Sequence, residues 1–337
     1  MVDKMHGFGL GVISENAKGA ILDVFYPTPL GDVTGPLSDA LSGVCGRLDR
    51  SDLKTLANDA RSAGDDALAA LSDRLSESPA SVVASSLAAN VAPVSVEDAY
   101  LKLHMLSHRL VKPHGTDLTG VFGLLPNVAW TDEGPIDVSE LAERQLTARL
   151  KGKVLEVASV DKFPKMTNYV VPEGVRIAHS ARVRLGAYLG AGTTVMHEGF
   201  INFNAGTAGP GMVEGRISAG VMVGKGSDLG GGCSTMGTLS GGGNMIISVG
   251  QECLIGANAG LGIPLGDRCT VEAGLFITAG TKVTVLDDAK QAVETTAARH
   301  LAGRSDLLFR RNSQSGSVEC LTNKTAIELN ESLHAHN

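Results

Sequence analysis

Aliphatic residues recur at every sixth position over a long stretch of the chain, from Val171 to about Val283. The first consecutive hexads read VPEGVR, IAHSAR, VRLGAY, LGAGTT, VMHEGF and INFNAG. The same pattern resumes at Ile217, Val249 and Leu265. A period of six is neither the 2.0 of an ordinary strand nor the 3.6 of a helix, so these residues form neither in the usual way.

A short repeat of fixed length is typical of a solenoid, in which each unit buries its apolar face against its neighbours. Hexads predict a parallel β-helix with three short strands per coil. The aliphatic lead residue is expected to point inward, and the small residue four places later to lie near a corner. Glycine at the second place, as in Gly190 and Gly224, suits the tight turns between strands. The chain is therefore expected to be mainly β.

The repeat loses its register at three places. The lead residues are sixteen apart over Ile201–Ile217, twenty apart over Leu229–Val249 and ten apart over Ile255–Leu265. Insertions in solenoids map to loops on one face, which is often the binding face. Gly241–Gly243, inside the second break, would let a backbone approach a ligand closely.

The repeat divides the chain into three predicted parts. These are an α/β domain at 1–150, the β-helix at 151–288 and a C-terminal helix and strand segment at 289–337. In the first part, strands are expected at Ala20–Tyr26 and in GVFGLLP (120–126), and helices over Leu53–Leu75, from Ser95 to Leu110 and over Val138–Leu150. In the last, a helix over Asp287–Ala302 is expected to precede a strand, a turn and a strand in DLLFRRNSQSGSVECL.

Composition narrows the class of protein. Glycine accounts for 42 of 337 residues, well above the usual roughly 7%, and most of the excess lies in the repeat. A net charge of −7 argues against nucleic acid or an anionic membrane as the main partner. The five cysteines form no C-x-x-C pair, and three occupy the small-residue place, so they are expected to be core residues. No signal peptide or membrane span is predicted, and a cytoplasmic location is expected.

Two polar segments stand out as candidates for chemistry. Glu198 lies in the string MHEGFINFNAG, close to His197, Asn202 and Arg216. A solvated corner carboxylate is the alternative for Glu198. The adjacent arginines of FRRNS (309–313) match the geometry of phosphate, and a surface ion pair is their alternative. A zinc site needs three histidines, and the repeat supplies too few for one.

These segments resemble tetrahydrodipicolinate N-succinyltransferase of the actinobacterial type, over about residues 160–321. The strings that carry the resemblance are DKFPKM, VRLGAYLGAGTTVMHEGFINFNAG, MVEGRISAGVMVG, TLSGGG, GANAGLGI, VEAGL and FRRNS. The resemblance implies a left-handed β-helix, a homotrimer with active sites between subunits, and succinyl-CoA as donor. Some members of this family hold a metal ion on the trimer axis, so a magnesium ion there is one expectation, although the sequence does not assign its ligands.

The resemblance also implies roles for single residues. The family's catalytic carboxylate falls on Glu198. Residues expected to bind the substrates or succinyl-CoA are Arg216, Gly231, Ser234, Ala257, Glu272, Ala273, Gly280, Arg310, Arg311, Asn312 and Ser313. Arg184 is a second cation for the substrate carboxylates.

The expected chemistry is attack of an amine on a thioester. Glu198 either accepts the proton of the amine or first takes the acyl group as a mixed anhydride, and the sequence leaves both routes open. The alternatives are a hexapeptide acyltransferase acting on another amine and a non-catalytic β-helix scaffold. A dicarboxylate acceptor would require more than one arginine at the site.

Overall fold

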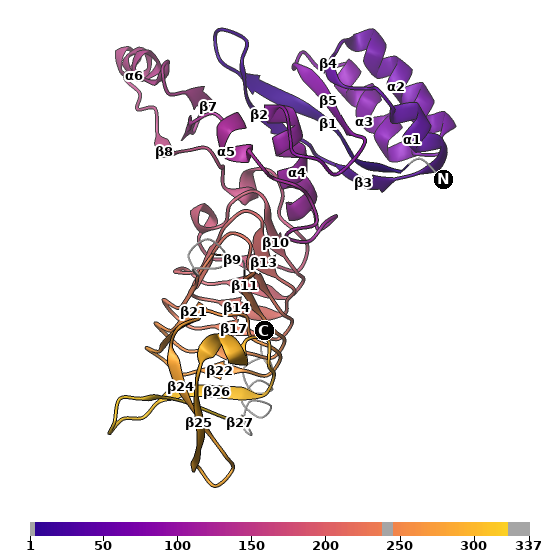
Figure 1. Cartoon of the computed structure of the whole chain (residues 1–337). Helices are drawn as coiled ribbons and strands as arrows, with labels where there is room; N and C mark the ends of the chain where they lie inside the picture. The colour runs from indigo at the N-terminus through magenta and orange to yellow at the C-terminus, as the bar shows by residue number, and fades with distance from the viewer. Residues whose placement is uncertain (1–3, 238–244, 323–337) are drawn as a thin grey trace. The chain divides into compact units, whose positions relative to one another are not determined.

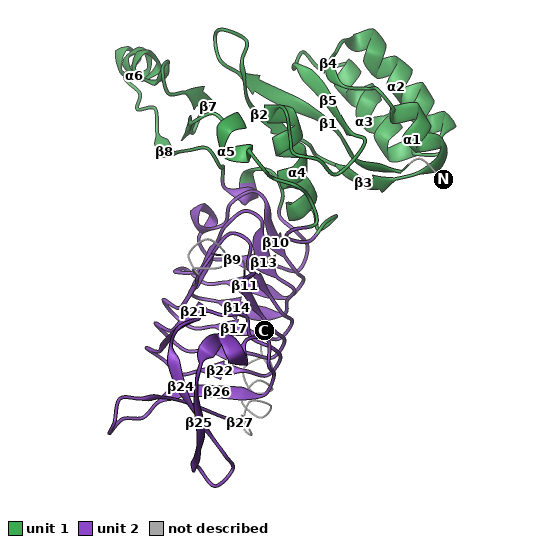
Figure 2. Cartoon of the chain, in the orientation of Figure 1, with its two compact units in different colours: residues 1–111, 115–164, 168–170 green, residues 112–114, 165–167, 171–337 purple. Residues whose placement is uncertain are grey.

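The computed structural model describes residues 4–237 and 245–322. The chain forms two compact units (Figures 1 and 2). The first contains residues 1–111, 115–164 and 168–170, and the second contains residues 112–114, 165–167 and 171–337. Within the described residues, no helix is long and apolar enough to cross a membrane.

The first unit is built on an antiparallel sheet around one long strand, β1 (Met5–Glu15). Its other strands are β2 (Ile21–Phe25), β3 (Leu30–Val33), β4 (Gly46–Leu48) and β5 (Val82–Leu87), in the order β2-β1-β5-β4 with β3 also paired to β1. Four helices accompany it, α1 (Gly35–Leu41), α2 (Arg50–Ser62), α3 (Asp66–Ser76) and α4 (Val96–Ser107).

Large side chains alternate with glycines along β1, and this explains how helices pack on both faces of the sheet. Phe8 and Leu10 point to one side, into a core shared with α2 and α3. Glycine occupies the intervening positions, and a Cβ on Gly9 would lie 2.7 Å from the Tyr26 ring and 2.8 Å from Leu101 of α4. The bare backbone on this side lets α4 and Tyr26 approach closely.

Most of the elements predicted for this unit are present. The strand at Ala20–Tyr26 is β2, and the helix after Ser95 is α4, whose Asp98 N–H donates to the Ser95 hydroxyl at 3.2 Å. The helix expected over Leu53–Leu75 is two helices, because Gly64 adopts a φ of +86° and Asp65 caps α3.

The second half of the unit corrects two expectations. GVFGLLP, expected to be a strand, contains the short helix α5 (Val121–Leu124). A small antiparallel sheet of β6 (Val128–Thr131), β7 (Gly134–Asp137) and β8 (Val157–Asp161) follows, together with the predicted helix, α6 (Leu141–Leu150). Residues 151–164 were assigned to the β-helix from sequence, but β8 pairs with β6, so this stretch belongs to the first unit.

The second unit is a coil of parallel strands arranged in three sheets (Figure 1). The first sheet contains β9 (Arg176–Ile177), β11 (Thr193–Val195), β14 (Gly211–Val213), β17 (Asp228–Leu229), β20 (Leu254–Ile255), β22 (Thr270–Val271) and β26 (Leu307–Arg311). The second contains β12 (Phe200–Ile201), β15 (Arg216–Ile217), β18 (Ser234–Thr235), β21 (Gly260–Gly262) and β23 (Phe276–Thr278). The third contains β10 (Ala187–Leu189), β13 (Ala205–Thr207), β16 (Met222–Val223) and β19 (Ser248–Val249).

From Val183 onward the hexad leads form the core of this coil as predicted, whereas Val171, the first of them, is 62% exposed. Val195, Ile201, Ile217 and Ile255 each have no exposed surface. Cys233, Cys253 and Cys269 are buried free thiols, which confirms that they are small core residues. The fold is therefore mainly β and is built from hexapeptide repeats.

The register breaks differ from the loops that were expected. Val195 pairs with Val213, eighteen residues later, whereas Val213 pairs with Leu229, only sixteen later. The first break is thus a coil shortened by two residues, and the pairing of Ile255 with Val271 shows a second short coil. Only the middle break lengthens a coil, and Gly241–Gly243 within it lie outside the described residues.

The C-terminal part also differs from the prediction. Instead of a helix over Asp287–Ala302, β24 (Lys282–Leu286) and β25 (Ala292–Ala297) form an antiparallel hairpin, followed by the 3-10 turn η3 (Ala298–Leu301). The Asp287 side chain accepts from the N–H groups of Ala289 and Gln291, and this turn competes with a helix. The strand, turn and strand expected next are β26 and β27 (Val318–Thr322).

Candidate functional site

Most of the residues singled out from sequence lie at one corner of the coil or on strands next to it. This corner, called the first corner here, joins the first sheet to the second in each coil. It consists of residues 196–199, 214–215, 230–233, 256–259 and 272–275, and β26 continues the same column through Phe309. Because the coils stack by parallel pairing, residues far apart in sequence form one line along this corner.

Glu198 lies at the first corner between β11 and β12. Its carboxylate accepts a hydrogen bond from the Arg182 guanidinium, Nη2 to Oε2, at 2.8 Å. The side chain is 66% exposed in the single chain. An exposed carboxylate has water on several sides, so only a partner chain or a bound substrate can exclude that water.

Two histidines stand beside Glu198. The His197 Nε2 lies 4.0 Å from the Glu198 Oε1, and the rings of His179 and His197 meet edge to face at 5.2 Å. Arg182 and His179 come from the preceding coil, next to the 3-10 turn η2 (Ser180–Arg182). Sequence reasoning missed Arg182 as a partner, although its place one coil before Glu198 could have been found by aligning the coils.

The corner that follows Glu198 along the coil is shorter than its neighbours. The first corner holds four residues at 196–199 and at 230–233 but only two at 214–215. Glu214 occupies this shortened turn, and its Oε2 lies 3.5 Å from the position a Cβ would take on Gly231. The turn between the coil of Glu198 and the coil of Gly231 is thus two residues shorter than either of its neighbours.

Arg216 and Ser234 are brought into direct contact. They are paired neighbours on β15 and β18, and the Arg216 Nη2 donates to the Ser234 hydroxyl at 2.7 Å. Phe200 precedes Arg216 in the same ladder. The guanidinium of Arg184 lies 5.9 Å from the centre of the Phe200 ring and donates to the Asn202 side chain at 3.1 Å. The Arg184 guanidinium therefore lies near the Phe200 ring, and Arg216 is the strand neighbour of Phe200.

The residues matched to the donor lie at equivalent places in successive coils. Gly231, Ala257, Ala273 and Arg311 each stand two places after the inward residue of their strand. The N–H of Asn258 donates to the Gly231 carbonyl at 2.9 Å, and that of Gly274 to the Ala257 carbonyl at 2.8 Å. The small side chains leave this line of backbone accessible from outside.

Glu272 and Arg311 join the last coil to this column. The Glu272 carboxylate accepts from the Arg311 backbone N–H at 2.7 Å. The Arg311 side chain is exposed, and its Nη1 donates to the Gly316 carbonyl at 3.1 Å. The hairpin of β26 and β27 therefore presents Arg311 at the end of the column.

Arg310 has a different environment from Arg311. Its Nε and Nη2 each donate to the Glu319 Oε2 at 2.9 Å, and the Glu319 side chain is only 9% exposed. Asn312 donates to the other carboxylate oxygen at 2.7 Å. The Asn312 hydrogen bond, followed by Arg310, lowers the pKa of Glu319 although its partial burial opposes this. The ion pair considered for FRRNS is thus present for Arg310, and the exposed Ser313 lies in the hairpin turn.

Gly280 does not share this corner. It lies between β23 and β24, where a Cβ would meet nothing within 4 Å. A metal ion would likewise need ligands from elsewhere, because residues 4–237 and 245–322 contain no group of three or more His, Cys, Asp or Glu side chains that could hold one. A magnesium ion on a trimer axis would take its ligands from three chains, so it stays a prediction.

Comparison with known proteins gives the family of this chain. A protein named 2,3,4,5-tetrahydropyridine-2,6-dicarboxylate N-succinyltransferase from Pseudomonas paraeruginosa is 63% identical over 344 aligned residues, with all of both chains covered. The protein of the same name from Vibrio cholerae is 57% identical, and the alignment covers 98% of this chain and 98% of that protein. The chain belongs to the 2,3,4,5-tetrahydropyridine-2,6-dicarboxylate N-succinyltransferases.

Family models and a solved structure agree with this membership. The tetrahydrodipicolinate N-succinyltransferase middle region matches residues 125–165, and the hexapeptide repeat of succinyl-transferase matches 246–279. A crystal structure of a putative 2,3,4,5-tetrahydropyridine-2-carboxylate N-succinyltransferase from Campylobacter jejuni has a TM-score of 0.86. It is 34% identical, and the match covers 96% of this chain and 94% of that one.

The relatives extend the resemblance and leave one part of it open. The resemblance was expected over about residues 160–321, but the relatives match the whole chain, including the first unit. They come from Pseudomonas and Vibrio, so the actinobacterial type that the motifs suggested stays a prediction.

Proposed function

We propose that this chain transfers a succinyl group from succinyl-CoA to the amine of ring-opened tetrahydropyridine-2,6-dicarboxylate, a step of lysine and diaminopimelate biosynthesis. Family membership over the full length supports this activity. The observation that carries the donor assignment is the column along the first corner. From β11 to β26 it spans five strand spacings, about 24 Å, which suits a donor with a thioester at one end and phosphates at the other.

Glu198 is proposed to act at the acceptor end of the column. The amine attacks the thioester carbonyl, the proton of the amine passes to the Glu198 carboxylate, and the CoA thiolate leaves and is protonated. In the second route the Glu198 carboxylate attacks the thioester carbonyl and expels the CoA thiolate, which leaves a mixed anhydride. The amine then attacks the succinyl carbonyl, the Glu198 carboxylate leaves, and it can accept the proton of the amine. Backbone N–H groups along the corner can stabilise the oxyanion in either route.

Arginines near Glu198 are proposed to bind the carboxylates of the substrates. Arg184 lies near the Phe200 ring, Arg216 pairs with Phe200 on the neighbouring strand, and Arg182 already contacts Glu198. Two carboxylates on the acceptor and one on the succinyl group require several cations. The presence of more than one arginine favours a dicarboxylate over the acceptor of another hexapeptide acyltransferase.

At the donor end, residues 310–313 are proposed to hold the CoA phosphates, with Gly231, Ser234, Ala257, Glu272 and Ala273 along the arm. Gly280 is proposed as an outlying contact, because it lies at the following corner. Arg311 presents an exposed guanidinium, whereas Arg310 fixes the hairpin through Glu319. The exposed Glu198 supports a site completed by a second chain in a homotrimer of left-handed coils. Binding of magnesium on the trimer axis and a cytoplasmic location belong to the same proposal.

A thiol-release assay tests this function. The chain is given tetrahydropyridine-2,6-dicarboxylate with succinyl-CoA, and in parallel with acetyl-CoA. We expect thiol release that depends on the acceptor and is faster with succinyl-CoA. Release with succinyl-CoA and an unrelated amine, but not with the dicarboxylate, would instead favour an acyltransferase with another acceptor.

A further inference from the structure

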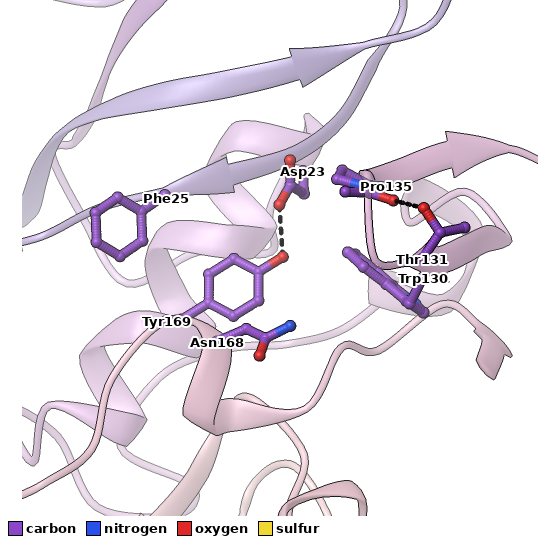
Figure 3. A pocket seen from close by; sticks show the side chains of 8 residues that line it. Asp23, Phe25, Trp130, Thr131, Pro135, Asn168 and Tyr169 are labelled. Atoms are coloured by element: carbon purple, nitrogen blue, oxygen red, sulfur yellow. Dashed lines mark hydrogen bonds between the residues drawn. The ribbon is translucent and has the colours of Figure 1, made fainter. Parts of the chain in front are cut away.

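The first unit contains a cavity that the proposed transfer reaction does not use. It has a volume of about 320 Å³ and is lined by Asp23, Phe25, Trp130, Thr131, Gly134, Pro135, Asn168 and Tyr169 (Figure 3). Asp23 and Phe25 come from β2, and Trp130 and Pro135 come from β6 and β7. The cavity thus lies where the two sheets of this unit meet, and none of its lining residues belongs to the coil.

A buried carboxylate forms the polar end of this cavity. Asp23 is 8% exposed, and the Tyr169 hydroxyl donates to its Oδ2 at 2.5 Å (Figure 3). Burial is the main cause that raises the pKa of this carboxyl, and the hydrogen bonds from Tyr169 and from the side chain and backbone of Ser14 oppose it without supplying a positive charge. Within the described residues no basic side chain lies within ion-pair distance of Asp23. A buried carboxylate without a cation is costly, and a bound cation would relieve that cost.

Aromatic rings form other walls of the same cavity. Trp130 and Tyr169 are each 8% exposed, and Phe25 is the most exposed of the three at 39%. The Trp130 Nε1–H donates to the Asp161 carbonyl at 2.9 Å, so its polar edge already has a partner. The rings of Phe25 and Tyr169 lie 6.4 Å apart. Ring faces attract organic cations, and a carboxylate beside them adds charge and a hydrogen-bond acceptor.

The residues behind Tyr169 supply no positive charge to the cavity. His104 of α4 packs edge to face on the Tyr169 ring at 5.4 Å and is fully buried. Its Nδ1 lies 2.8 Å from the Tyr100 carbonyl and donates to it, while its Nε2 accepts from the Tyr26 N–H at 3.3 Å. Burial lowers the pKa of His104 to about 3, so the ring is neutral at physiological pH. Any cation that pairs with Asp23 must therefore come from outside.

We propose that this cavity binds a small aliphatic amine in its ammonium form. The ammonium group pairs with Asp23, and the carbon chain packs on the Trp130 and Phe25 rings. The amide of Asn168 stands beside Tyr169 in the same lining and offers a second polar contact. This site lies in the first unit, whereas Glu198 lies in the second, so the inference is independent of the succinyl-transfer proposal.

Calorimetric titration of the full chain with 1,5-diaminopentane tests this site. We expect saturable binding of the diamine and none of 1,5-pentanediol, which has the same chain length without the charge. Asp23→Asn keeps the shape and the hydrogen bond from Tyr169 but removes the charge, so it should weaken binding by about tenfold or more. Asp73→Asn is the matched control, because Asp73 is an exposed acid of the same unit that pairs with Arg61. It should bind like the wild type.

Three outcomes would overturn the proposal. The wild type shows no saturable binding with a Kd below about 10 mM, the diol binds as well as the diamine, or Asp23→Asn binds the diamine with unchanged affinity. If circular dichroism shows that Asp23→Asn does not fold, the affinity of Trp130→Leu for the diamine is measured instead. This substitution removes an aromatic wall and leaves Asp23 in place, so unchanged affinity in that variant would contradict the site.

Discussion

At the scale of single residues, Glu198 and Glu214 provide a matched pair of carboxylates on neighbouring coils. Glu198→Gln keeps the shape of the side chain but loses its basicity and its acyl-accepting oxygen. We expect kcat for succinyl transfer to fall by about 10² to 10⁴, with the oligomeric state unchanged. Steady-state thiol release and sedimentation measure both properties.

Glu214→Gln serves as the control for Glu198→Gln. Glu214 lies against Gly231 in the shortened turn, so the change should leave most of kcat intact. The catalytic assignment would be wrong if Glu198→Gln kept more than about a tenth of kcat while Glu214→Gln lost its activity.

The adjacent arginines of β26 should respond differently to truncation. Arg311→Ala removes an exposed guanidinium and is expected to raise the KM for succinyl-CoA by about tenfold, with little change in the KM for the acceptor. Arg310→Ala leaves the nearly buried Glu319 without its cation, so it should lower the midpoint of thermal unfolding. Equal KM values for Arg311→Ala and the wild type would remove this residue from the phosphate site.

His104 makes the stability of the first unit depend on pH. Its pKa is lowered to about 3 in the folded chain, against 6.5 for an ordinary histidine, so the unfolded chain binds more protons between these values. Stability from this group is therefore present above about pH 6.5 and is lost as the pH falls toward 3, by up to about 1.4 kcal/mol per pH unit. Asp23 has the opposite effect, because its pKa is raised above the usual 3.8. Its contribution to the stability of the folded chain falls as the pH rises above that value.

His104→Asn isolates the contribution of the histidine, because its amide can still donate to Tyr100 and does not titrate. Unfolding midpoints of the variant and the wild type, measured from pH 7 to pH 4, should converge as the pH falls. A constant difference between the two would show that His104 does not titrate in this range.

At the scale of elements, the glycines of β1 hold α4 close to the sheet. Gly9→Ala would place a methyl group against Tyr26 and Leu101, and we expect it to destabilise the chain by about 1–3 kcal/mol. Gly123→Ala in α5, where the new methyl meets nothing within 4 Å, should be neutral or slightly stabilising. Denaturant unfolding of both variants compares them, and equal stabilities would show that α4 can move aside.

The elements show which patterns predict structure and which do not. Hexads predicted the coil because the same inward position recurs in every strand. The helix expected over Asp287–Ala302 failed because Asp287 closes a turn and Thr295 and Thr296 favour a strand. β1 was missed because its alternate glycines hide the period of two, and their role becomes visible only when α4 packs on them.

At the scale of the whole molecule, the main prediction is that the chain forms a homotrimer. The coil exposes large apolar side chains, including Phe276 at 55% and Ile246 at 53%, and threefold packing would cover such surface. Sedimentation velocity at micromolar concentration should give the mass of three chains. A monomer there would contradict both the trimer and a site formed between chains.

The site was predictable as a set of residues but not as an arrangement. Motifs selected Glu198, Arg216 and the FRRNS segment, and the structure places Glu198 at the first corner, Arg216 at the start of β15 beside it, and FRRNS on β26 and the turn that follows. Sequence alone did not separate Arg310 from Arg311, because the partner of Arg310, Glu319, comes from the other strand of a hairpin. Gly280 was grouped with the others by resemblance, although it lies at the following corner.

The regular stacking of the first corner fixes the distance between groups on different coils. Each strand spacing adds about 4.8 Å between the carboxylate of Glu198 and the guanidinium of Arg311, and hydrogen bonds between coils fix the increments. In the proposed site, the number of coils between these two groups sets the length of the donor that fits. Adding or removing a whole coil would leave the residues at either end unchanged. A change in the number of coils would therefore be enough to fit a longer or a shorter donor.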